Sequence, residues 1–338
     1  MFVRKNRTDA VILSDMQPGF IITIDTEGDN LWGRTAQITT RNTAHLPRFQ
    51  RLCERFGFKP TWLTNYEMAM DPVFVEFGRD LVARGCGEIG MHLHAWNSPP
   101  LSPLTSDDMR HHPYLIEYPL EVMREKIAFM TRLLEERFAM KMLSHRAGRW
   151  AFDTRYAQLL VRFGYIADCS VTPGVSWQTH AGSPGGAGGS DYRGFPSQPY
   201  FLDLGDIARA GDSPLLEVPM TTRASRLATL LPWSHTLPGV RRVAYRVAPQ
   251  VHWLRPNGRN LSAMRHLVRQ AVSERCVHLE FMLHSSELMP GGSPTFRTPA
   301  SIEKLYADLE VLFADIAAHF SGATLGGFAQ RYRLQPQP

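Results

Sequence analysis

Short hydrophobic runs alternate with amphipathic stretches along the first half of the chain. The runs predict buried strands, and apolar residues spaced by three and four positions predict helices. The expected strands cover residues 19–24, 60–64, 88–94, 140–145 and 165–170. The expected helices between them cover 42–56, 72–84, 120–138 and 153–163. Because strand and helix alternate, the pattern predicts βα units and a mainly parallel sheet or barrel.

The regular alternation breaks after residue 170. The glycine-rich stretch 181–190 predicts a flexible loop, either a lid or an inserted segment. Residues 215–219 predict a sixth strand, whereas 221–260 mixes arginines with large apolar residues at irregular spacing. The last part of the chain returns to order, with expected elements at 261–274 (helix), 277–283 (strand) and 302–320 (amphipathic helix).

These elements indicate one α/β fold rather than several domains. We expect a distorted parallel (β/α) barrel of about seven strands over residues 1–338. An insertion over 176–260 should follow strand five, because this stretch lacks a clear strand and helix pattern.

Composition and charge restrict the class of protein. The 338 residues are 43% hydrophobic and 20% charged, which is ordinary for a globular chain. The apolar run at 10–13 is too short for a signal peptide, and no run approaches the ~20 residues of a membrane span. The four cysteines show no CxxC pairing, which favours free thiols. We therefore expect a cytoplasmic protein.

A net charge of +5, with many arginines at 223–259, is compatible with several anionic partners. The chain contains no recognisable nucleic-acid module, so we expect no nucleic-acid partner. Tryptophan and leucine side chains within 223–259 suggest peripheral contact with the inner membrane surface. The alternative is a solvated basic insertion.

Two histidines stand at the end of the third expected strand. On an extended backbone His92 and His94 project to one side, where two imidazoles can share a metal ion. The alternative is one hydrogen-bonded core histidine and one chance surface residue. Other polar side chains also follow strands, at Asp25, Glu27, Arg146, Asp168 and His284. Parallel α/β folds place their chemistry at this edge of the sheet.

Five segments occur in the order of a known set of motifs. They are TIDTEG (23–28), EIGMHLH (88–94), HRAGRW (145–150), DCS (168–170) and LHSSEL (283–288). This succession resembles the polysaccharide deacetylase family, the NodB-like carbohydrate esterases, over about residues 20–290. The resemblance implies a distorted barrel with one divalent metal ion, usually zinc. It also implies removal of N-acetyl or related acyl groups from amino sugars.

The resemblance implies a role for each matching residue. The catalytic base falls on Asp25, and the arginine that holds it falls on Arg146. The general acid falls on His284, with Asp168 as its expected orienting carboxylate. The metal ligands fall on Glu27, His92 and His94.

The chain departs from the usual motifs of the family in three places. Asp25 and Glu27 stand where adjacent aspartates are common, so either could be the base and the other the ligand. Trp96 holds the usual position of the second metal histidine, and the proline that commonly follows the arginine motif is missing after Arg146. These differences resemble a subgroup linked to the biosynthesis of surface polysaccharides such as O-antigen.

The substrate expected from the resemblance is an amino sugar that is nucleotide-linked, lipid-linked or polymeric. Trp96 and Trp150 flank the motifs and could stack on sugar rings or simply pack in the fold. Two other functions remain open: a carbohydrate-binding protein without activity, and a hydrolase of another C–N bond such as a deformylase or cyclic amide hydrolase. The joint presence of Asp25, Arg146 and His284 favours an enzyme.

Overall fold

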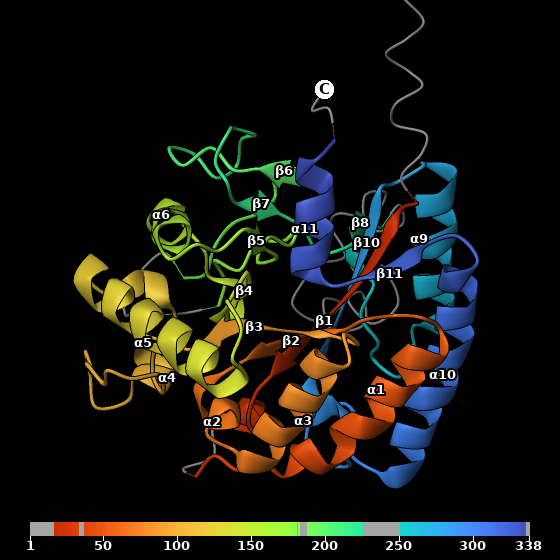
Figure 1. Cartoon of the computed structure of the whole chain (residues 1–338), viewed down its shortest axis with the longest axis horizontal. Coiled ribbons are helices and arrows are strands. Elements are labelled where there is room, and N and C mark those ends of the chain that lie inside the picture. The colour runs from red at the N-terminus through yellow and green to blue at the C-terminus, as the bar shows by residue number, and fades with distance from the viewer. Residues whose placement is uncertain (1–16, 34–36, 181, 183–187, 226–250, 336–338) are drawn as a thin grey trace, which may run out of the picture.

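The computed structural model describes residues 17–33, 37–180, 182, 188–225 and 251–335. At its centre lies a curled sheet of nine strands, flanked by helices on its outer side (Figure 1). The strands run in the order β10-β1-β2-β3-β4-β5-β7-β6, and β11 also pairs with β1. Since this order begins at β10 and ends at β6, the sheet forms an open half-barrel.

Seven strands of this path are parallel to one another, which confirms the predicted parallel barrel of about seven strands. They are β1 (Gly19–Thr26), β2 (Thr61–Thr64), β3 (Glu88–Leu93), β4 (Ser144–Ala147), β5 (Ala167–Asp168), β7 (Leu216–Glu217) and β10 (His278–His284). The edge strand β6 (Tyr200–Phe201) is antiparallel to β7, and β11 (Ser321–Ala323) is parallel to β1.

The helices of the described residues lie around the sheet (Figure 1). They are α1 (Leu46–Arg55), α2 (Tyr66–Ala69), α3 (Pro72–Ala83), α4 (Asp108–His111), α5 (Leu120–Phe138), α6 (Thr154–Arg162), α9 (Leu261–Ser273), α10 (Pro299–Ala317) and α11 (Leu325–Arg333). None of them is long and apolar enough to cross a membrane. The expected long helices are all present, with ends within a few residues of those predicted.

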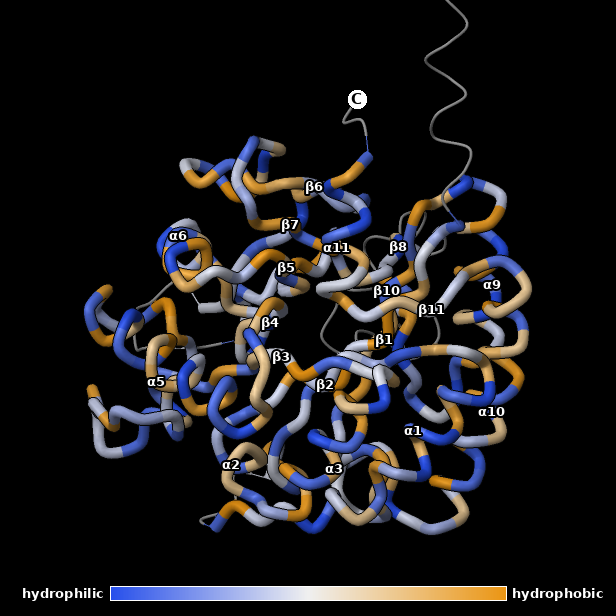
Figure 2. Tube along the Cα trace, viewed as in Figure 1, coloured by the Kyte–Doolittle hydropathy of each residue, from blue (hydrophilic) through white to orange (hydrophobic). Residues whose placement is uncertain are grey.

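Buried hydrophobic side chains explain these elements. Every residue of β1 is buried, as expected for a central parallel strand covered on both faces. Helix α5 buries residues at spacings of three and four, among them Ile127, Met130 and Leu134. Figure 2 shows the corresponding change between hydrophobic and hydrophilic positions along α10. The sheet and the helices around it therefore enclose the core.

Three predictions about elements need correction. Strand β4 begins at Ser144 rather than at residue 140, and β5 is limited to two residues. The proposed insertion, 176–260, is too broad because β6 and β7 lie inside it and join the main sheet. Within the same stretch, β8 (Thr222–Ala224) and β9 (Val251–Trp253) pair only with each other. Residues 226–250 and most of the glycine-rich stretch lie outside the described residues.

The register of the parallel strands brings the expected site residues to one edge of the sheet. Asp25 on β1 stands beside His284 on β10, and His92 on β3 stands beside Arg146 on β4. Residues far apart in the sequence thus become neighbours at the carboxyl ends of adjacent strands. This edge is where parallel α/β folds place their chemistry.

Candidate metal and catalytic site

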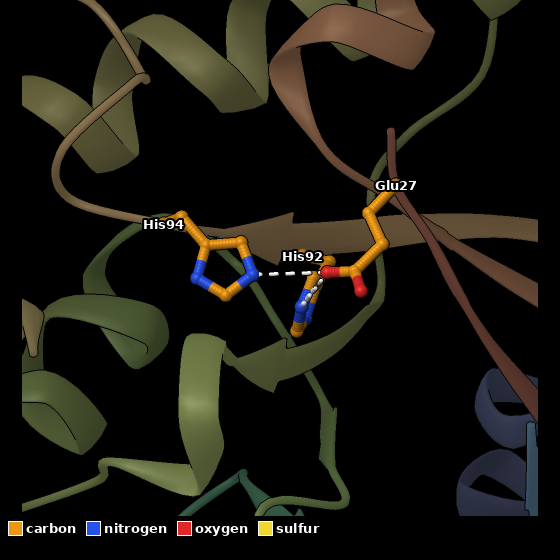
Figure 3. Close-up of side chains that lie close together, drawn as sticks. All are labelled: Glu27, His92 and His94. Atoms are coloured by element: carbon orange, nitrogen blue, oxygen red, sulfur yellow. Dashed lines mark hydrogen bonds and ion pairs between the residues drawn. The ribbon is translucent and has the colours of Figure 1, made fainter. Parts of the chain in front are cut away.

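A carboxylate and two imidazoles meet at this edge and form the Glu27–His92–His94 cluster (Figure 3). Glu27 follows β1, His92 belongs to β3, and His94 follows the end of β3. All three residues are buried, and their ligand atoms lie within 4.8 Å of one another. The cluster is therefore compact enough for its three side chains to hold one ion.

The two imidazoles present their Nε2 atoms to the same carboxylate oxygen. His94 Nε2 lies 3.0 Å from Glu27 Oε2, and His92 Nε2 lies 3.7 Å from it. His92 Nδ1 donates to the backbone carbonyl of Arg146 at 3.0 Å. Because this bond places the proton of a neutral His92 ring on Nδ1, Nε2 keeps a lone pair that faces the cluster.

Close backbone packing places His94 against the chain after β4. A Cβ atom on Gly148 would lie 2.4 Å from the carbonyl oxygen of Leu93 and 2.6 Å from His94 Nδ1. That Nδ1 atom is buried and has no hydrogen-bond partner among the described residues. A larger residue at position 148 would displace His94, so the glycine is needed for this geometry.

The donor set fits a divalent metal ion. Two imidazole nitrogens and one carboxylate oxygen are a common protein ligand set for zinc in catalytic sites, where a further position stays open for water or substrate. Burial would raise the pKa of Glu27, but the charge of His284 and the hydrogen bonds of His92 and His94 hold this pKa well below its usual value. Glu27 is therefore ionised, as a metal ligand must be.

Asp25 is held by a fully buried guanidinium group. Arg146 Nη1 donates to Asp25 Oδ1 at 2.7 Å, and Arg146 Nη2 donates to Glu280 Oε1 and Thr23 Oγ1 at 2.6 Å. Burial would raise the pKa of Asp25, but the charge of Arg146, with those of His92 and His284, lowers it overall. The expected contact between Arg146 and Asp25 is thus present, and Asp25 carries its charge at neutral pH.

The ring of His284 closes the other side of the site. Its Nε2 atom lies 3.8 Å from Asp25 Oδ2 and 3.7 Å from Glu27 Oε1. Its Nδ1 atom lies 3.2 Å from Glu287 Oε2 and 3.0 Å from Arg255 Nη2. Hence Nε2 faces the two acidic residues, while Nδ1 contacts a buried carboxylate and an arginine.

The expectation that Asp168 orients His284 is wrong. Asp168 Oδ1 lies 2.5 Å from Nδ1 of His145, and Nε2 of that histidine lies 2.8 Å from the hydroxyl of Tyr156. The carboxylate of Asp168 is already engaged, because it also accepts hydrogen bonds from the backbone N–H and the hydroxyl of Ser170. Glu287, three residues after His284, is the carboxylate that contacts the ring.

The site residues open into a cavity of about 350 Å³, called here the catalytic cavity. Asp25, His284 and all three members of the Glu27–His92–His94 cluster line it. The two tryptophans expected near the substrate, Trp96 and Trp150, line it as well. Trp150 is only 7% exposed and packs under the guanidinium of Arg146 at 4.6 Å, so it also has a packing role.

Several residues of the catalytic cavity were not identified from the sequence. They are Leu31, Trp32, Met109, Tyr114, Arg149, Trp177, His180 and Arg255. Arg255 and Trp177 come from the irregular part of the chain, where spacing gives no signal. Arg149 and Trp150 have φ angles of 54° and 61°, an uncommon conformation for such side chains that is found at functional sites. No pattern in the sequence predicts this turn.

A buried glutamate ties together two loops that carry cluster residues. Glu67 Oε1 accepts from the backbone N–H of Gly28, and Glu67 Oε2 accepts from Asn97 Nδ2, both at 2.7 Å. Burial raises the pKa of Glu67 to about 7. The loop after β1 and the loop after β3 are therefore held against the same side chain, which fixes their relative positions.

Comparison with solved structures agrees with this architecture. A protein from Mycobacterium smegmatis described as a polysaccharide deacetylase aligns with a TM-score of 0.53 at 15% identity, over 96% of this chain and 94% of its own. One from Pseudomonas aeruginosa with the same description gives a TM-score of 0.51 at 16% identity, over 95% and 92%.

A third solved structure, described as a glycoside hydrolase/deacetylase from Parabacteroides distasonis, gives a TM-score of 0.59 at 10% identity. This alignment covers 95% of the chain and 72% of the other protein. No protein-family model and no curated protein sequence matches the chain. At these identities the likeness establishes the shared fold.

Proposed function

We propose that this chain is a metal-dependent hydrolase that removes an N-acetyl group from an amino sugar. The observation that carries the proposal is the convergence of three kinds of group in one cavity. These are the Glu27–His92–His94 cluster, a carboxylate held by a buried arginine, and the imidazole of His284. The shared fold with proteins described as polysaccharide deacetylases supports the same class of reaction.

In this proposal Glu27, His92 and His94 hold one divalent ion, and zinc suits their nitrogen and oxygen donors. When bound, such an ion acidifies a coordinated water and polarises the acyl carbonyl. The protein keeps the ligands ready for this task. His92 is oriented by its bond to the carbonyl of Arg146, and Glu27 stays ionised between the two imidazoles.

Asp25 acts as the base that takes a proton from the attacking water. Arg146 occupies its Oδ1 atom, whereas its Oδ2 atom is turned toward His284 and His92. The buried guanidinium keeps the carboxylate charged and fixes its orientation. The contacts thus favour Asp25 as base and Glu27 as ligand, the choice that the sequence left open.

His284 acts as the acid. Its Nε2 atom donates a proton to the amide nitrogen as the C–N bond breaks, so that acetic acid and the free amine leave. After the reaction Asp25 holds the proton of the attacking water and His284 lacks the proton it gave to the amine. Asp25 then loses a proton to solvent and His284 gains one from it, which returns both groups to their starting states. Glu287 orients the His284 ring through Nδ1, the task first expected of Asp168.

Acetate release from N-acetylglucosamine and its short β-linked oligomers by the zinc-loaded full chain tests the function. We expect release by the wild type and a loss of at least about a hundredfold in Asp25→Asn, with bound zinc retained. Release of formate from N-formyl sugars, without acetate from acetyl sugars, would indicate the deformylase alternative. A zinc-loaded protein that binds these sugars but releases neither acid would instead be a carbohydrate-binding protein.

The cytoplasmic location and the role in surface-polysaccharide biosynthesis stay predictions from the sequence. The same holds for contact with the inner membrane surface, because much of the arginine-rich stretch that suggested it, 226–250, lies outside the described residues.

A further inference from the structure

Two further cavities adjoin the catalytic cavity, and they differ in charge. One, of about 300 Å³, shares Trp96 with the catalytic cavity, and its charged lining residues are Asp107 and Asp108. The other, of about 400 Å³, shares Arg255 with the catalytic cavity, and among the described residues that line it Glu287 is the only acid. We call the cavity with Arg255 in its wall the basic cavity. A ligand that extends out of the catalytic cavity therefore meets acids in one and a cation in the other.

Arg255 is held by one of its nitrogen atoms only. Its Nη2 atom lies 3.0 Å from His284 Nδ1 and 3.4 Å from both carboxylate oxygens of Glu287. Glu287 also accepts from the backbone N–H of His284 at 3.0 Å, so its charge is shared between two residues. Among the described residues Nε and Nη1 of Arg255 have no hydrogen-bond partner, and 27% of the side chain is exposed. Arg255 therefore has N–H groups left to donate to an anion.

An ordered turn carries Arg255 together with a second arginine. Asn260 donates from Nδ2 to the carbonyl of Arg255 at 2.8 Å and accepts from the backbone N–H of Asn257 at 2.9 Å. The side chain of Asn257 accepts from the backbone N–H of Arg259 at 3.0 Å. Gly258 has a φ angle of 79°, a conformation that favours glycine. The turn is thus fixed by its own hydrogen bonds, so both arginines are placed before a ligand binds.

A neighbouring loop adds a third arginine. A Cβ atom on Gly258 would lie 3.5 Å from the ring of Phe296, so the turn and this loop pack together. Thr295 of the loop lines the basic cavity, and Arg297 follows two residues later. Arg259 and Arg297 are both exposed, and neither forms an ion pair with a described carboxylate. The rim of the basic cavity therefore carries an excess of positive charge.

Arg255 also stands next to the group that serves the leaving nitrogen. In the proposed reaction His284 Nε2 faces the amide nitrogen, and Arg255 lies against the other nitrogen of the same ring. In many amino sugars the carbon that bears the acylamino group is bonded directly to the anomeric carbon. A phosphate on the anomeric oxygen then lies on the side of the sugar nearest to Arg255. Arg149, the other arginine of the catalytic cavity, does not line the basic cavity.

We propose that Arg255 binds a phosphate on the anomeric oxygen of the acylated sugar, with Arg259 and Arg297 adding positive charge at the rim of the basic cavity. The substrate is then a phosphate-linked sugar rather than an uncharged glycan. The inference rests on the proposed function, since it places the acylated sugar in the catalytic cavity. Guanidinium groups suit phosphate because their planar N–H groups match its oxygens in geometry and charge.

Two kinds of substrate carry such a phosphate, a sugar nucleotide and a sugar linked to a lipid diphosphate. Trp177 and Trp253 line the basic cavity with their ring centres 6.1 Å apart. Indole faces suit a nucleobase, which stacks on them, and also an isoprenoid chain, which packs against them. The phosphate is the chemistry that the two substrates share, so a direct comparison of their turnover distinguishes them.

The dependence of activity on substrate charge tests the proposal. The phosphate probes are N-acetylglucosamine-1-phosphate, its uridine diphosphate form and its farnesyl diphosphate form, and the uncharged reference is the methyl glycoside, each with the zinc-loaded full chain. We expect kcat/KM for acetate release to be at least about tenfold higher for the best phosphate probe than for the methyl glycoside. The better of the nucleotide and lipid forms identifies the source of the phosphate. A methyl glycoside that reacts as well as every phosphate probe would overturn the proposal.

The variant Arg255→Gln assigns the effect to this side chain. We expect its kcat/KM to fall about tenfold more for the best phosphate probe than for the methyl glycoside, because only the phosphate loses an ionic contact. Arg255→Lys keeps the charge and should recover part of that preference. Equal losses on both substrates in Arg255→Gln would show that Arg255 acts only through His284, and this result would overturn the phosphate site.

Two further variants separate local from overall charge. Arg259→Gln removes a cation that makes no hydrogen bond to His284, and the preference for phosphate should fall about threefold. Arg110→Gln is the matched control, because it removes an exposed arginine beside Met109 in the wall of the catalytic cavity. This control should keep the preference of the wild type. A loss of preference in Arg110→Gln as large as in Arg255→Gln would reduce the effect to net charge and contradict the assignment.

A failure of the proposed function is distinguishable from a failure of this inference. If no probe releases acetate, calorimetric titration of N-acetylglucosamine-1-phosphate against the zinc-loaded wild type and Arg255→Gln still tests the site. An affinity that falls about tenfold in the variant, and in the wild type weakens from about 50 to about 500 mM NaCl, would support a phosphate site in a protein without this activity. Equal affinity in both proteins, as expected for phosphate bound by zinc alone, or no binding to either, would overturn the site.

Discussion

Two buried clusters of imidazole and carboxylate groups lie at the carboxyl ends of neighbouring strands, yet they differ in what they can do. In the first, Glu27, His92 and His94 line the catalytic cavity. In the second, His145 uses both ring nitrogens, one toward Asp168 at 2.5 Å and one toward Tyr156 at 2.8 Å. The first cluster, called here the open cluster, lines a cavity and has room for a ligand. The second, called here the satisfied cluster, already has a hydrogen-bond partner for each nitrogen of its imidazole.

The carboxylates of the two clusters also differ in the charges that surround them. Glu27 has imidazoles near it, and its pKa is well below the usual value in spite of burial. Asp168 has Glu217 near it, and burial together with the charge of Asp168 raises the pKa of Glu217 well above the usual value. The first cluster thus favours an ionised carboxylate, Glu27, and the second favours a protonated Glu217 beside Asp168. Residue type and strand position alone do not separate the two cases.

The largest effect should follow from breaking the open cluster. His94→Gln should lower kcat/KM for acetate release by about a thousandfold, because metal activation of water contributes several kcal/mol to transition-state stabilisation. Steady-state acetate release under zinc saturation measures it. Activity within about tenfold of the wild type would show that the reaction does not depend on this cluster.

The next largest effect concerns Arg146, the buried arginine that binds Asp25 and Glu280. Arg146→Met leaves the carboxylates of Asp25 and Glu280 buried without their cation, which should lower the free energy of unfolding by about 3–5 kcal/mol. Urea denaturation followed by circular dichroism gives the value. Arg84→Met, which breaks exposed ion pairs to Glu54 and Asp80, is the matched control and should cost less than about 1 kcal/mol. Similar losses in both variants would contradict the account.

A buried histidine outside both clusters, His278, extends the comparison to pH. His278 Nε2 donates to the carbonyl of Pro219 at 3.0 Å, and burial lowers its pKa to about 4 from 6.5. Between pH 4 and 6.5 the imidazole of His278 is protonated in the unfolded chain but neutral in the folded one. The free energy of unfolding should therefore increase by about 3 kcal/mol as the pH rises from 4 to 6.5. His278→Gln should remove this part of the slope in urea titrations at several pH values. If the free energies of unfolding of the wild type and the variant differ by the same amount at every pH, His278 makes no such contribution.

The smallest effect on activity should come from the satisfied cluster. Asp168→Asn keeps the shape of the side chain but loses a charged hydrogen bond to His145, which should cost about 2 kcal/mol of stability. Because Asp168 does not line the catalytic cavity, kcat/KM per folded molecule should stay within about threefold of the wild type. A thousandfold loss at full zinc content would restore a direct catalytic role to Asp168.

The sequence predicted well what depends on local periodicity. Helix α5 begins and ends where its apolar spacing does, and the seven parallel strands follow from the alternation of strand and helix. The spacing of His92 and His94 also predicted two imidazoles on one side of the strand, and the structure brings both together with Glu27. Side chains two apart on a strand share a face, and that rule is local.

What the sequence missed depends on strand order and on irregular segments. The orienting role of Asp168 was wrong because its carboxylate is bound by His145 and Ser170, and local periodicity does not record which side chains meet across strands. Arg255 comes from a stretch without periodicity, and the hydrogen bonds of Leu254 to Thr221 and Met282 hold this segment beside the site. Long-range contacts of this kind arise from packing, so they appear only once the fold is known.

Metal content is the most direct test of the central claim, that the open cluster binds a divalent ion and the satisfied cluster does not. The wild type, His92→Ala and Asp168→Asn are each loaded with zinc, dialysed and analysed by mass spectrometry. The account predicts about one zinc ion per chain in the wild type and in Asp168→Asn, and none in His92→Ala. A wild type that retains no zinc, or a His92→Ala variant that retains as much as the wild type, would contradict it.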